Sequence, residues 1–309
     1  MLQDISPYKL DNHYDPDIRP DDDSFIIIMR GDARDREVLI KRQEDGTISF
    51  PRYSDLLCAG KTNSESIIGA GHDLSAENPI VYIFSISDEK FFLWTDREAS
   101  ELPAGIQAGF TFCKMADVRR EGTGPRHYIF AMYTAFHLYE WYSSTRFCGK
   151  CGRPNKNDTV ERARVCTCCG HKVYPRINPA VIIGVTDKDT GRMILTKYRT
   201  GFAQNALVAG FTEIGETLEE TVSREVMEEV GLHVENVRYY KSQPWGVACD
   251  ILSGFFCDVC GDKEIKMDAS ELKYAQWVAP EDIVLQNPDY SLTNEMMRLF
   301  KEKGYEGTV

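Results

Sequence analysis

One stretch of this chain carries the hydrophobic pattern of a helix with a single buried face. Its apolar residues recur at every fourth position, at Leu218, Val222, Val226 and Val230. The ends of the helix are marked as well, because Thr217 and Glu220 form a Thr-x-x-Glu capping box and Gly231 favours the left-handed turn that stops a helix. The pattern therefore predicts an amphipathic helix over residues 218–230.

Short apolar runs separated by polar turns predict strands in the rest of the chain. Those of the first part cover residues 25–29, 37–40, 79–86 and 91–95. Those of the last part cover residues 179–186, 193–198, 237–241 and 251–258. The first two of these later strands are predicted to form a hairpin, and a final helix is predicted at residues 293–303. The first 24 residues, rich in Asp and Pro, are predicted to be loose.

Residues 127–143 are apolar on nearly every side, which predicts a helix buried between its neighbours. His127 and His137 on this helix are expected to pack rather than to bind metal. The elements predict an α+β chain in four parts: a mostly β N-terminal domain over 1–126, a linking helix over 127–145, a cysteine-rich segment over 146–175 and an α+β domain over 176–309. The N-terminal domain carries no catalytic constellation, and a decayed copy of the C-terminal fold stays open for it.

Composition and charge narrow the class of protein. The chain has 309 residues, of which 42% are hydrophobic and 27% charged, as expected for two or three globular domains. Its apolar runs are too short to span a bilayer, and its first residues lack the features of a secretory signal, so a cytoplasmic protein without a membrane segment is expected. The net charge of −12 argues against binding to duplex DNA. A nucleotide substrate remains compatible with this charge when metal ions help to bind it.

Two Cys-x-x-Cys pairs, separated by 14 residues, have the spacing of a four-cysteine zinc ribbon. The predicted ligands are Cys148, Cys151, Cys166 and Cys169. Cys168 is a surplus cysteine whose use would shorten the second pair to Cys-x-Cys, and His171 is a further substitute, but Cys169 is preferred. Because four thiolates close the coordination shell, one structural zinc ion per chain is expected.

The remaining cysteines give no second site. Cys257 and Cys260 form another Cys-x-x-Cys pair, but no partner pair is left to complete a metal shell, and they end a strand-like run. Together with Cys58, Cys113 and Cys249 they are interpreted as incidental thiols.

Carboxylates gather on the predicted helix at 218–230. The helical step places Glu225, Glu228 and Glu229 on one arc beside the apolar face, and Glu216 lies in the preceding loop. Such like charges repel one another unless a cation lies among them. Ligands that are all oxygen favour Mg²⁺ or Mn²⁺, and Mg²⁺ is typically shared with substrate phosphates. The arrangement therefore predicts a divalent-metal site for a phosphate-bearing substrate.

The segment from Gly210 to Leu232 resembles the Nudix box at every defining position, from the glycine and the glutamate after five residues to the Arg-Glu-apolar-x-Glu-Glu-x-Gly-apolar end. The resemblance implies hydrolysis of a nucleoside diphosphate linked to another moiety. Three features in order resemble the NADH pyrophosphatase branch: the cysteine ribbon after a helix, the Leu-Val-Ala-Gly-Phe before the box, and Ser242-Gln-Pro-Trp245 after it. The implied fold is a C-terminal Nudix α/β/α sandwich with a mixed sheet, preceded by a zinc ribbon and the mostly β domain.

The resemblance also implies roles for the acidic residues. Glu225, Glu228 and Glu229 become ligands or near-ligands of two or more Mg²⁺ or Mn²⁺ ions, with the carbonyl group of Ala209 beside them. Glu271 matches a further metal-binding or base-like glutamate. Arg224 is expected to pin Glu216 or a ligand carboxylate, and the choice of catalytic base among the glutamates stays open.

Residues for substrate recognition are implied in the same way. Phe211, Trp245 and Tyr174 match positions that enclose the bases, and Tyr174 is expected to reach the partner subunit of a homodimer. Glu161 matches an acid of the ribbon that contacts substrate. The remaining implied contacts are Gln243, Pro244, Asp250 and Thr293.

The chain departs from the branch pattern after Trp245. The family's array continues Pro-Phe-Pro-x-Ser, whereas this chain has Gly246-Val-Ala-Cys-Asp250. The departure leaves the hydrolytic residues in place and puts selectivity for NAD(H) in question. The expected function is hydrolysis of NAD(H) to NMN(H) and AMP, with NAD-capped RNA 5′ ends as a further substrate. Two alternatives stay open: a Nudix hydrolase for another conjugate such as ADP-ribose, and a regulator that binds nucleotide without hydrolysing it.

Overall fold

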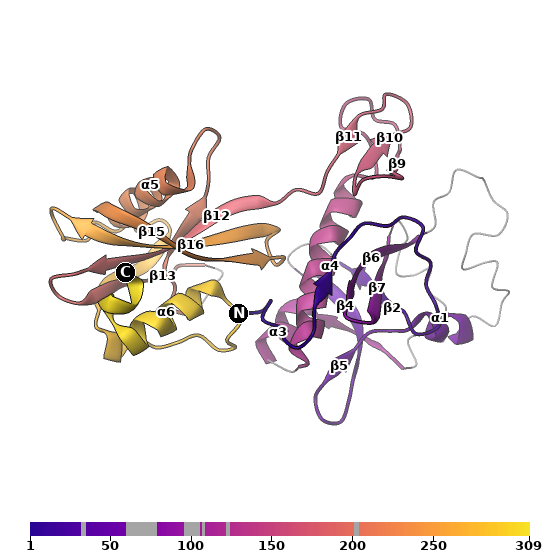
Figure 1. Cartoon of the computed structure of the whole chain (residues 1–309), viewed down its shortest axis with the longest axis horizontal. Coiled ribbons are helices and arrows are strands. Elements are labelled where there is room, and N and C mark those ends of the chain that lie inside the picture. The colour runs from indigo at the N-terminus through magenta and orange to yellow at the C-terminus, as the bar shows by residue number, and fades with distance from the viewer. Residues whose placement is uncertain (32–34, 60–78, 96–105, 107–108, 122–123, 201–203) are drawn as a thin grey trace. The chain divides into compact units, whose positions relative to one another are not determined.

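The structure is a computed structural model that describes residues 1–31, 35–59, 79–95, 106, 109–121, 124–200 and 204–309 (Figure 1). The chain divides into two compact units, which are described separately. Unit 2 comprises Asp4–Arg176, and unit 1 comprises Ile177–Val309 together with Met1–Gln3. Within the ranges just given, no helix combines the length and apolar character needed to cross a membrane.

The first part of unit 2 is mostly β, as predicted. One sheet has the order β1-β6-β7-β2, with β1 Leu10–Asp11, β6 Ile80–Ile86, β7 Glu89–Trp94 and β2 Phe25–Ile27. Another has the order β3-β4-β5, with β3 Met29–Arg30, β4 Glu37–Arg42 and β5 Ile48–Ser49, and β8 Thr111–Lys114 also pairs with β4. The helices are α1 Tyr53–Ala59, α3 Met115–Glu121 and α4 Arg126–Ser144.

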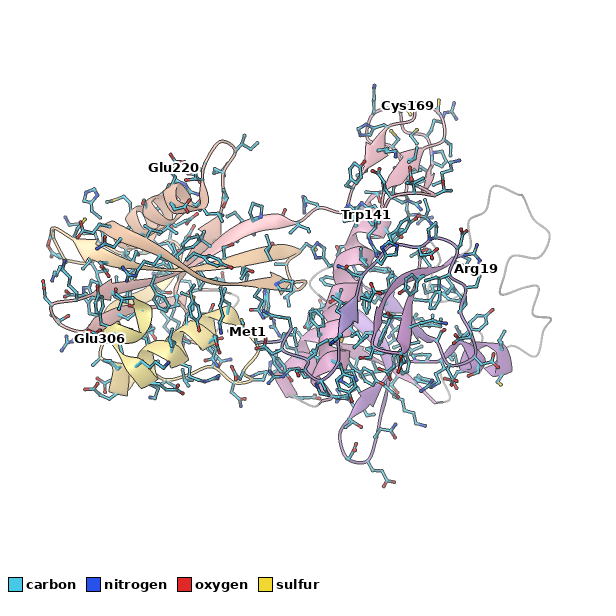
Figure 2. All side chains as sticks on the ribbon, in the orientation of Figure 1. Met1, Arg19, Trp141, Cys169, Glu220 and Glu306 are labelled. Atoms are coloured by element: carbon cyan, nitrogen blue, oxygen red, sulfur yellow. The ribbon has the colours of Figure 1, made fainter. Side chains whose placement is uncertain are left out.

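Helix α4 has the predicted extent and the predicted burial. Its apolar residues point in several directions because it packs against β6 and β7 and carries the ribbon at its C-terminal end; Figure 2 labels Trp141 near that end. The ring of His127 stacks on that of Tyr8 at 3.9 Å between centroids. His137 Nε2 lies 2.7 Å from the carbonyl oxygen of Arg176. Both contacts agree with packing roles for the two histidines.

Unit 1 is built on one mixed sheet with the order β15-β16-β12-β13-β17. Its strands are β15 His233–Trp245, β16 Asp250–Cys260, β12 Asn178–Asp187, β13 Arg192–Tyr198 and β17 Leu272–Val278, and β14 Val208–Phe211 also pairs with β12. The β12–β16 pair is parallel and the others are antiparallel. Its helices are α5 Leu218–Val230 and α6 Leu292–Lys303, and the short 3-10 helices η3 Pro280–Asp282 and η4 Tyr305–Thr308 precede and follow α6.

The two helices cover opposite faces of this sheet. Because side chains alternate along a strand, β12 sends Val181 and Ile183 into the core beneath α5, and Ala180 and Ile182 into the core beneath α6. The periodic valines of α5 fill the first core, and Phe300 with its neighbours on α6 fills the second. The predicted α/β/α sandwich with a mixed sheet is therefore confirmed.

The prediction of a loose N-terminal segment was wrong for several of its residues. Met1 and Leu2 are buried, and the amide of Leu2 donates to the carbonyl oxygen of Tyr290 over 2.9 Å. Leu10 and Asp11 form β1 and pair with the end of β6. These partners lie far away in the sequence, so the local excess of Asp and Pro did not reveal them.

Two predicted strands also differ in extent. The run 25–29 divides at Ile28, because Phe25–Ile27 pairs with β7 whereas Met29–Arg30 pairs with β4. The strand predicted at 237–241 extends over His233–Trp245, since β16 offers it a partner along its whole length through two register shifts. Polar residues at the ends of β15 hid this extension from a hydrophobic pattern.

Candidate active site

Helix α5 begins and ends where the sequence predicted. The side chain of Thr217 accepts a hydrogen bond from the amide of Glu220 over 3.2 Å, and Glu220 Oε2 accepts one from the amide of Thr217 over 2.8 Å. Figure 2 shows Glu220 at the start of this helix. Gly231 has the left-handed conformation, with φ of 69°. The caps fix the rotation and length of the helix, and thereby the positions of its acids.

Arg224 ties the acidic loop to the helix. Its Nε and Nη2 donate to the two carboxylate oxygens of Glu216 over 2.6 and 2.9 Å. Its Nη1 donates to Glu225 over 2.8 Å and to Glu228 over 3.0 Å, and Nη2 also reaches the carbonyl oxygen of Phe211. The guanidinium group thus fixes the loop end of β14 against α5, as the predicted pinning role requires.

Glu216 is the acid that this arrangement keeps ionised. Hydrogen bonds from Arg224 and from the amide of Glu213, with a further bond from Thr221, lower the pKa of Glu216 to about 2. Both carboxylate oxygens of Glu216 accept hydrogen bonds from protein donors, so this residue stabilises the conformation of the loop.

Glu229 has the opposite environment. It is only 3% exposed, and its Oε2 is buried without a hydrogen-bond partner. Burial, followed by the charges of Glu225 and Glu271, raises the pKa of Glu229 to about 8, although the amide of Ala209 acts against this. A buried carboxylate with one unpartnered oxygen is costly by itself and is relieved by a cation.

Gly210 makes room for the next acid. A Cβ atom at this position would lie 1.9 Å from the carboxyl carbon of Glu225. Burial raises the pKa of Glu225, with Arg224 acting in the opposite direction and Glu228 and Glu271 adding to the rise. The glycine is therefore needed for the close approach of β14 to this carboxylate.

These observations fit a hard divalent cation. The donor set is all oxygen, Glu229 Oε2 lacks a partner, and the charges of Glu225, Glu229 and Glu271 act on one another. Glu271 itself is exposed, directly before β17. The amide of Ala209 donates to Glu229 Oε1 over 3.4 Å, a contact that the sequence did not indicate. Metal binding by the carbonyl group of Ala209 stays a prediction.

The substrate residues predicted on unit 1 differ in their exposure to solvent. Phe211 is 54% exposed at the end of β14, next to the acidic loop. Pro244 is exposed, whereas Trp245 is partly buried against the α6 core. Thr293 is half-buried in the first turn of α6. Asp250 is buried, and its Oδ1 accepts a bond from Asn178 over 3.3 Å.

Gln243, for which contact with substrate is predicted, lies in the interior of unit 1. Its side chain is fully buried and donates to Gln3 Oε1 and to the carbonyl oxygen of Tyr290. Its Oε1 accepts from the amide of Leu292 over 2.6 Å, at the start of α6. The side chain of Gln243 therefore joins β15, the N-terminus of the chain and α6, which leaves no atom directed toward solvent.

The substrate residues predicted on unit 2 lie together. Glu161 Oε2 accepts hydrogen bonds from the hydroxyl of Tyr174 over 2.8 Å and from Lys172 Nζ over 3.0 Å. The bond from Tyr174, followed by that from Lys172, lowers the pKa of Glu161. Both Glu161 and Tyr174 are exposed on the ribbon, where they are accessible to a ligand.

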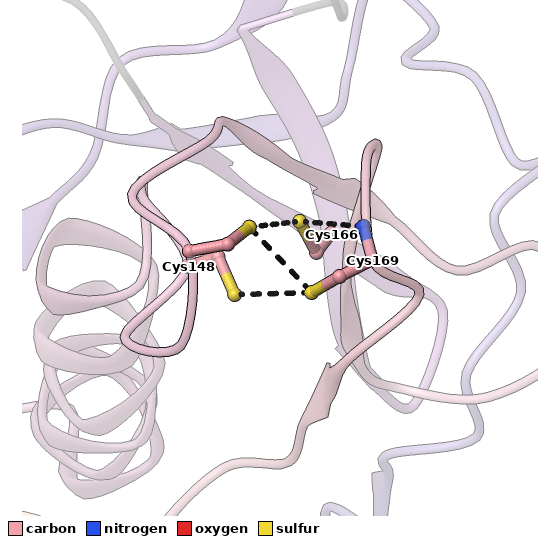
Figure 3. A group of neighbouring side chains, drawn as sticks. Cys148, Cys166 and Cys169 are labelled. Carbon is pink, nitrogen blue, oxygen red and sulfur yellow. Dashed lines mark hydrogen bonds between the residues drawn. The ribbon is translucent and has the colours of Figure 1, made fainter.

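The ribbon consists of β9 Asn155–Asn157, β10 Arg164–Cys166 and β11 Lys172–Val173, in the order β11-β10-β9. Figure 3 shows the cysteine sulfurs turned toward one another. The Sγ atoms of Cys148, Cys151, Cys166 and Cys169 all lie within 4.8 Å of one another. In the described ranges this is the one such cluster of His, Cys, Asp or Glu ligand atoms; the box glutamates, bridged by Arg224, do not form another.

The two Cys-x-x-Cys segments that supply these sulfurs form the same kind of turn. The amide of Gly152 donates to the carbonyl oxygen of Cys148, and the amide of Gly170 to that of Cys166. Both glycines have φ near 70°, which suits a tight turn. Amides of Cys169 and Cys168 donate to Cys166 Sγ and lower the pKa of this thiol to about 6. The four thiols thus fit a zinc ion, and the sulfur cluster contains the preferred Cys169 and not Cys168.

Purified protein is expected to contain about one tightly bound zinc ion per chain. Cys151→Ser should lose the zinc and destabilise the ribbon, because a ligand is removed from a closed shell. Cys168→Ser is the matched control and should keep the zinc, since Cys168 lies outside the sulfur cluster. Elemental analysis after dialysis, with thermal melts of both variants, measures this difference. Equal zinc loss in the two variants would contradict the ligand set.

Sequence reasoning missed one residue at the carboxylates. The hydroxyl of Tyr198 lies 3.4 Å from Glu229 Oε1. Tyr198 was predicted only as the end of a strand, and a strand pattern does not indicate which distant acid a terminal residue will meet.

Comparisons with known proteins match the two parts of the chain that carry these sites. Residues 176–300 match the family model of the NUDIX domain, and residues 143–174 match that of the NADH pyrophosphatase zinc ribbon domain. Two relatives described as "NAD-capped RNA hydrolase NudC", from Klebsiella pneumoniae subsp. pneumoniae and Citrobacter koseri, are 38% and 37% identical. Each alignment covers 161 residues, 52% of this chain and 62% of the relative, so the chain spans less than two thirds of their length.

The structure is also similar to a solved one titled "Crystal structure of NUDIX hydrolase from Nitrosomonas europaea". The two have a TM-score of 0.43 and 21% sequence identity, over 51% of this chain and 90% of that chain.

Proposed function

We propose that this chain, in which an NADH pyrophosphatase zinc ribbon precedes a Nudix domain, hydrolyses the pyrophosphate linkage of NAD(H) to NMN(H) and AMP. NAD-capped RNA 5′ ends are a second proposed substrate, in line with the names of the relatives at 38% and 37% identity. The observation that carries the proposal is the buried carboxylate of Glu229, with its unpartnered Oε2, among the other acids of the box.

The proposed metal ligands are Glu225, Glu228 and Glu229, with Glu271 and the carbonyl group of Ala209 beside them. Two or more Mg²⁺ or Mn²⁺ ions held there would neutralise the pyrophosphate oxygens and lower the pKa of a bound water. The protein's own contribution is to hold the acids. Arg224 and Glu216 fix the loop, Gly210 leaves space for Glu225, and Glu229 Oε2 is buried without a competing partner.

Exposed aromatic rings support a nucleotide substrate. Phe211 is 54% exposed and its backbone carbonyl is bound by Arg224, so its position is tied to that of the acids. A base stacked on such a ring would bring its phosphates toward the carboxylates. For Tyr174 and Glu161 on the ribbon we propose contacts with substrate, with Tyr174 serving the partner subunit of a homodimer. A cytoplasmic location is part of the same proposal.

The direct test is a panel of dinucleotides, incubated with the zinc-loaded protein and Mg²⁺ or Mn²⁺ and followed by product chromatography. NADH, NAD⁺, ADP-ribose and an NAD-capped RNA 5′ fragment form the panel. Release of NMN(H) and AMP supports the proposal. Fast cleavage of another conjugate with no cleavage of NAD(H) would support a hydrolase but contradict NAD(H) as its substrate. Binding without any product would indicate a regulator.

Selectivity for NADH over ADP-ribose is expected to be weak, less than about 10-fold in kcat/KM. A site rejects an analogue strongly when polar groups built for the missing part are left unpaired. Here Gln243 is committed to Gln3, Tyr290 and Leu292, and Asp250 is buried beside Asn178. Competition between the two substrates in one reaction measures the ratio directly. A preference for NADH beyond about 10³-fold would show that other residues read the nicotinamide moiety.

A further inference from the structure

Tyr198 lies outside the Nudix box but reaches its most deeply buried acid. It is the last residue of β13, and its hydroxyl lies 3.4 Å from Glu229 Oε1. The amide of Ala209 on β14 donates to the same oxygen, also over 3.4 Å. The other oxygen, Oε2, is buried without a partner. Two donors therefore approach one oxygen of the carboxylate and leave the second one available.

A β-bulge brings Tyr198 to this position. The regular pairing of β13 with β17 shifts at this tyrosine, so that Tyr198 lies opposite Leu272 and Lys273 is passed over. Bulges re-aim side chains and are frequent next to active sites. Beyond the bulge, the amide of Arg199 donates to the carbonyl oxygen of Glu271 over 3.0 Å. Tyr198 and Glu271 are thus placed at the same end of the sheet.

The hydroxyl of Tyr198 remains a hydrogen-bond donor here. It points at Glu229 Oε1 as the acceptor, and Tyr198 itself is partly buried against the core beneath α5. A phenol that keeps its proton next to a carboxylate can satisfy one carboxylate oxygen but cannot compete for a cation. Both distances are 3.4 Å, at the long end for hydrogen bonds to a carboxylate.

We infer that Tyr198 is a positioning residue, whose hydroxyl fixes Glu229 through Oε1 so that Oε2 is presented to the divalent cation. The inference rests on the proposed function, because it concerns an acid that this function assigns to metal binding. Partners that orient metal ligands typically change metal affinity or activity by roughly 10–100-fold when they are removed. Tyr198 acts through Glu229 and needs no contact with the substrate.

Tyr198→Phe tests this role, because it removes one hydroxyl and keeps the ring that packs against the core beneath α5. The zinc-loaded full chain is titrated with Mn²⁺ by calorimetry in the absence of substrate. The apparent dissociation constant for Mn²⁺ should rise about 10-fold. In turnover assays the Mn²⁺ concentration for half-maximal rate should rise by a similar factor, while kcat at saturating Mn²⁺ falls less than about 3-fold.

Tyr239→Phe is the matched control, since Tyr239 is 60% exposed on β15, and it should leave Mn²⁺ binding unchanged. Unchanged Mn²⁺ affinity in Tyr198→Phe, with or without a lower Tm, would overturn the inference. If Glu229→Gln weakens Mn²⁺ binding and Tyr198→Phe does not, the positioning role alone fails. If the unmodified chain neither binds Mn²⁺ nor cleaves any dinucleotide, the proposed function fails and the inference falls with it.

Discussion

Replacing Glu229 with glutamine is expected to lower kcat by at least ~10²-fold with little change in folding. Glutamine has the shape of the protonated acid but not the charge that binds a cation. Because burial already raises the pKa of Glu229 to about 8, the metal-free fold accommodates a neutral group at this position. The loss should therefore appear in catalysis and in metal binding. Steady-state assays at saturating Mg²⁺ or Mn²⁺ measure the loss of kcat, and thermal melts of the metal-free protein measure any change in folding.

Glu228→Gln is expected to have a similar effect on kcat, although Glu228 is far more exposed than Glu229. Glu219→Gln is the matched control, because it removes an equal charge from the first turn of the same helix, on an exposed position. It should retain near-normal turnover. If Glu229→Gln also retains near-normal turnover at saturating metal, Glu229 is not a ligand of the catalytic ions.

The elements that the sequence predicted well are those whose limits depend on neighbouring residues. Helix α5 has its predicted ends, because Thr217, Glu220 and Gly231 act within one turn of the residues they cap. The zinc ligands were predicted for the same reason, since each Cys-x-x-Cys turn closes on itself. A contact of Arg224 with Glu216 or with a ligand carboxylate was predicted from the box resemblance, and the structure contains both kinds of contact.

The missed features depend on residues that are distant in the sequence. Met1 and Leu2 looked like part of a loose polar segment, but their partners lie in the last part of the chain. The bond that the start of α6 makes to Gln243 was not expected either, and contact of this residue with substrate stays a prediction. Tyr198 contacts Glu229 at a point where a bulge shifts the pairing of two strands. Hydrophobic periodicity indicates which face of an element is buried, and it contains no information on contacts between residues that are distant in the sequence.

Gly210→Ala is expected to lower kcat by ~10²-fold while the free energy of unfolding changes little. The added Cβ would lie 1.9 to 2.3 Å from the carboxyl atoms of Glu225, so the two groups cannot occupy their present positions together. Because the obstructed atoms are the far end of a flexible side chain, the fold can relieve the clash by rotating Glu225 away from β14 and from Arg224. The loss then falls on the metal site rather than on the core. Assays of kcat together with urea unfolding measure both quantities.

A double-mutant cycle distinguishes this cause from general damage to β14. In a Glu225→Ala background the obstructed carboxylate is absent, so adding Gly210→Ala should cause little further loss of kcat. Gly109→Ala is the control for the substitution itself, since no atom lies within 4 Å of its added Cβ. If Gly210→Ala reduces kcat by the same factor with and without the Glu225 carboxylate, the two positions act independently. Non-additive losses would instead show that the first glycine of the box is there to admit this one acid.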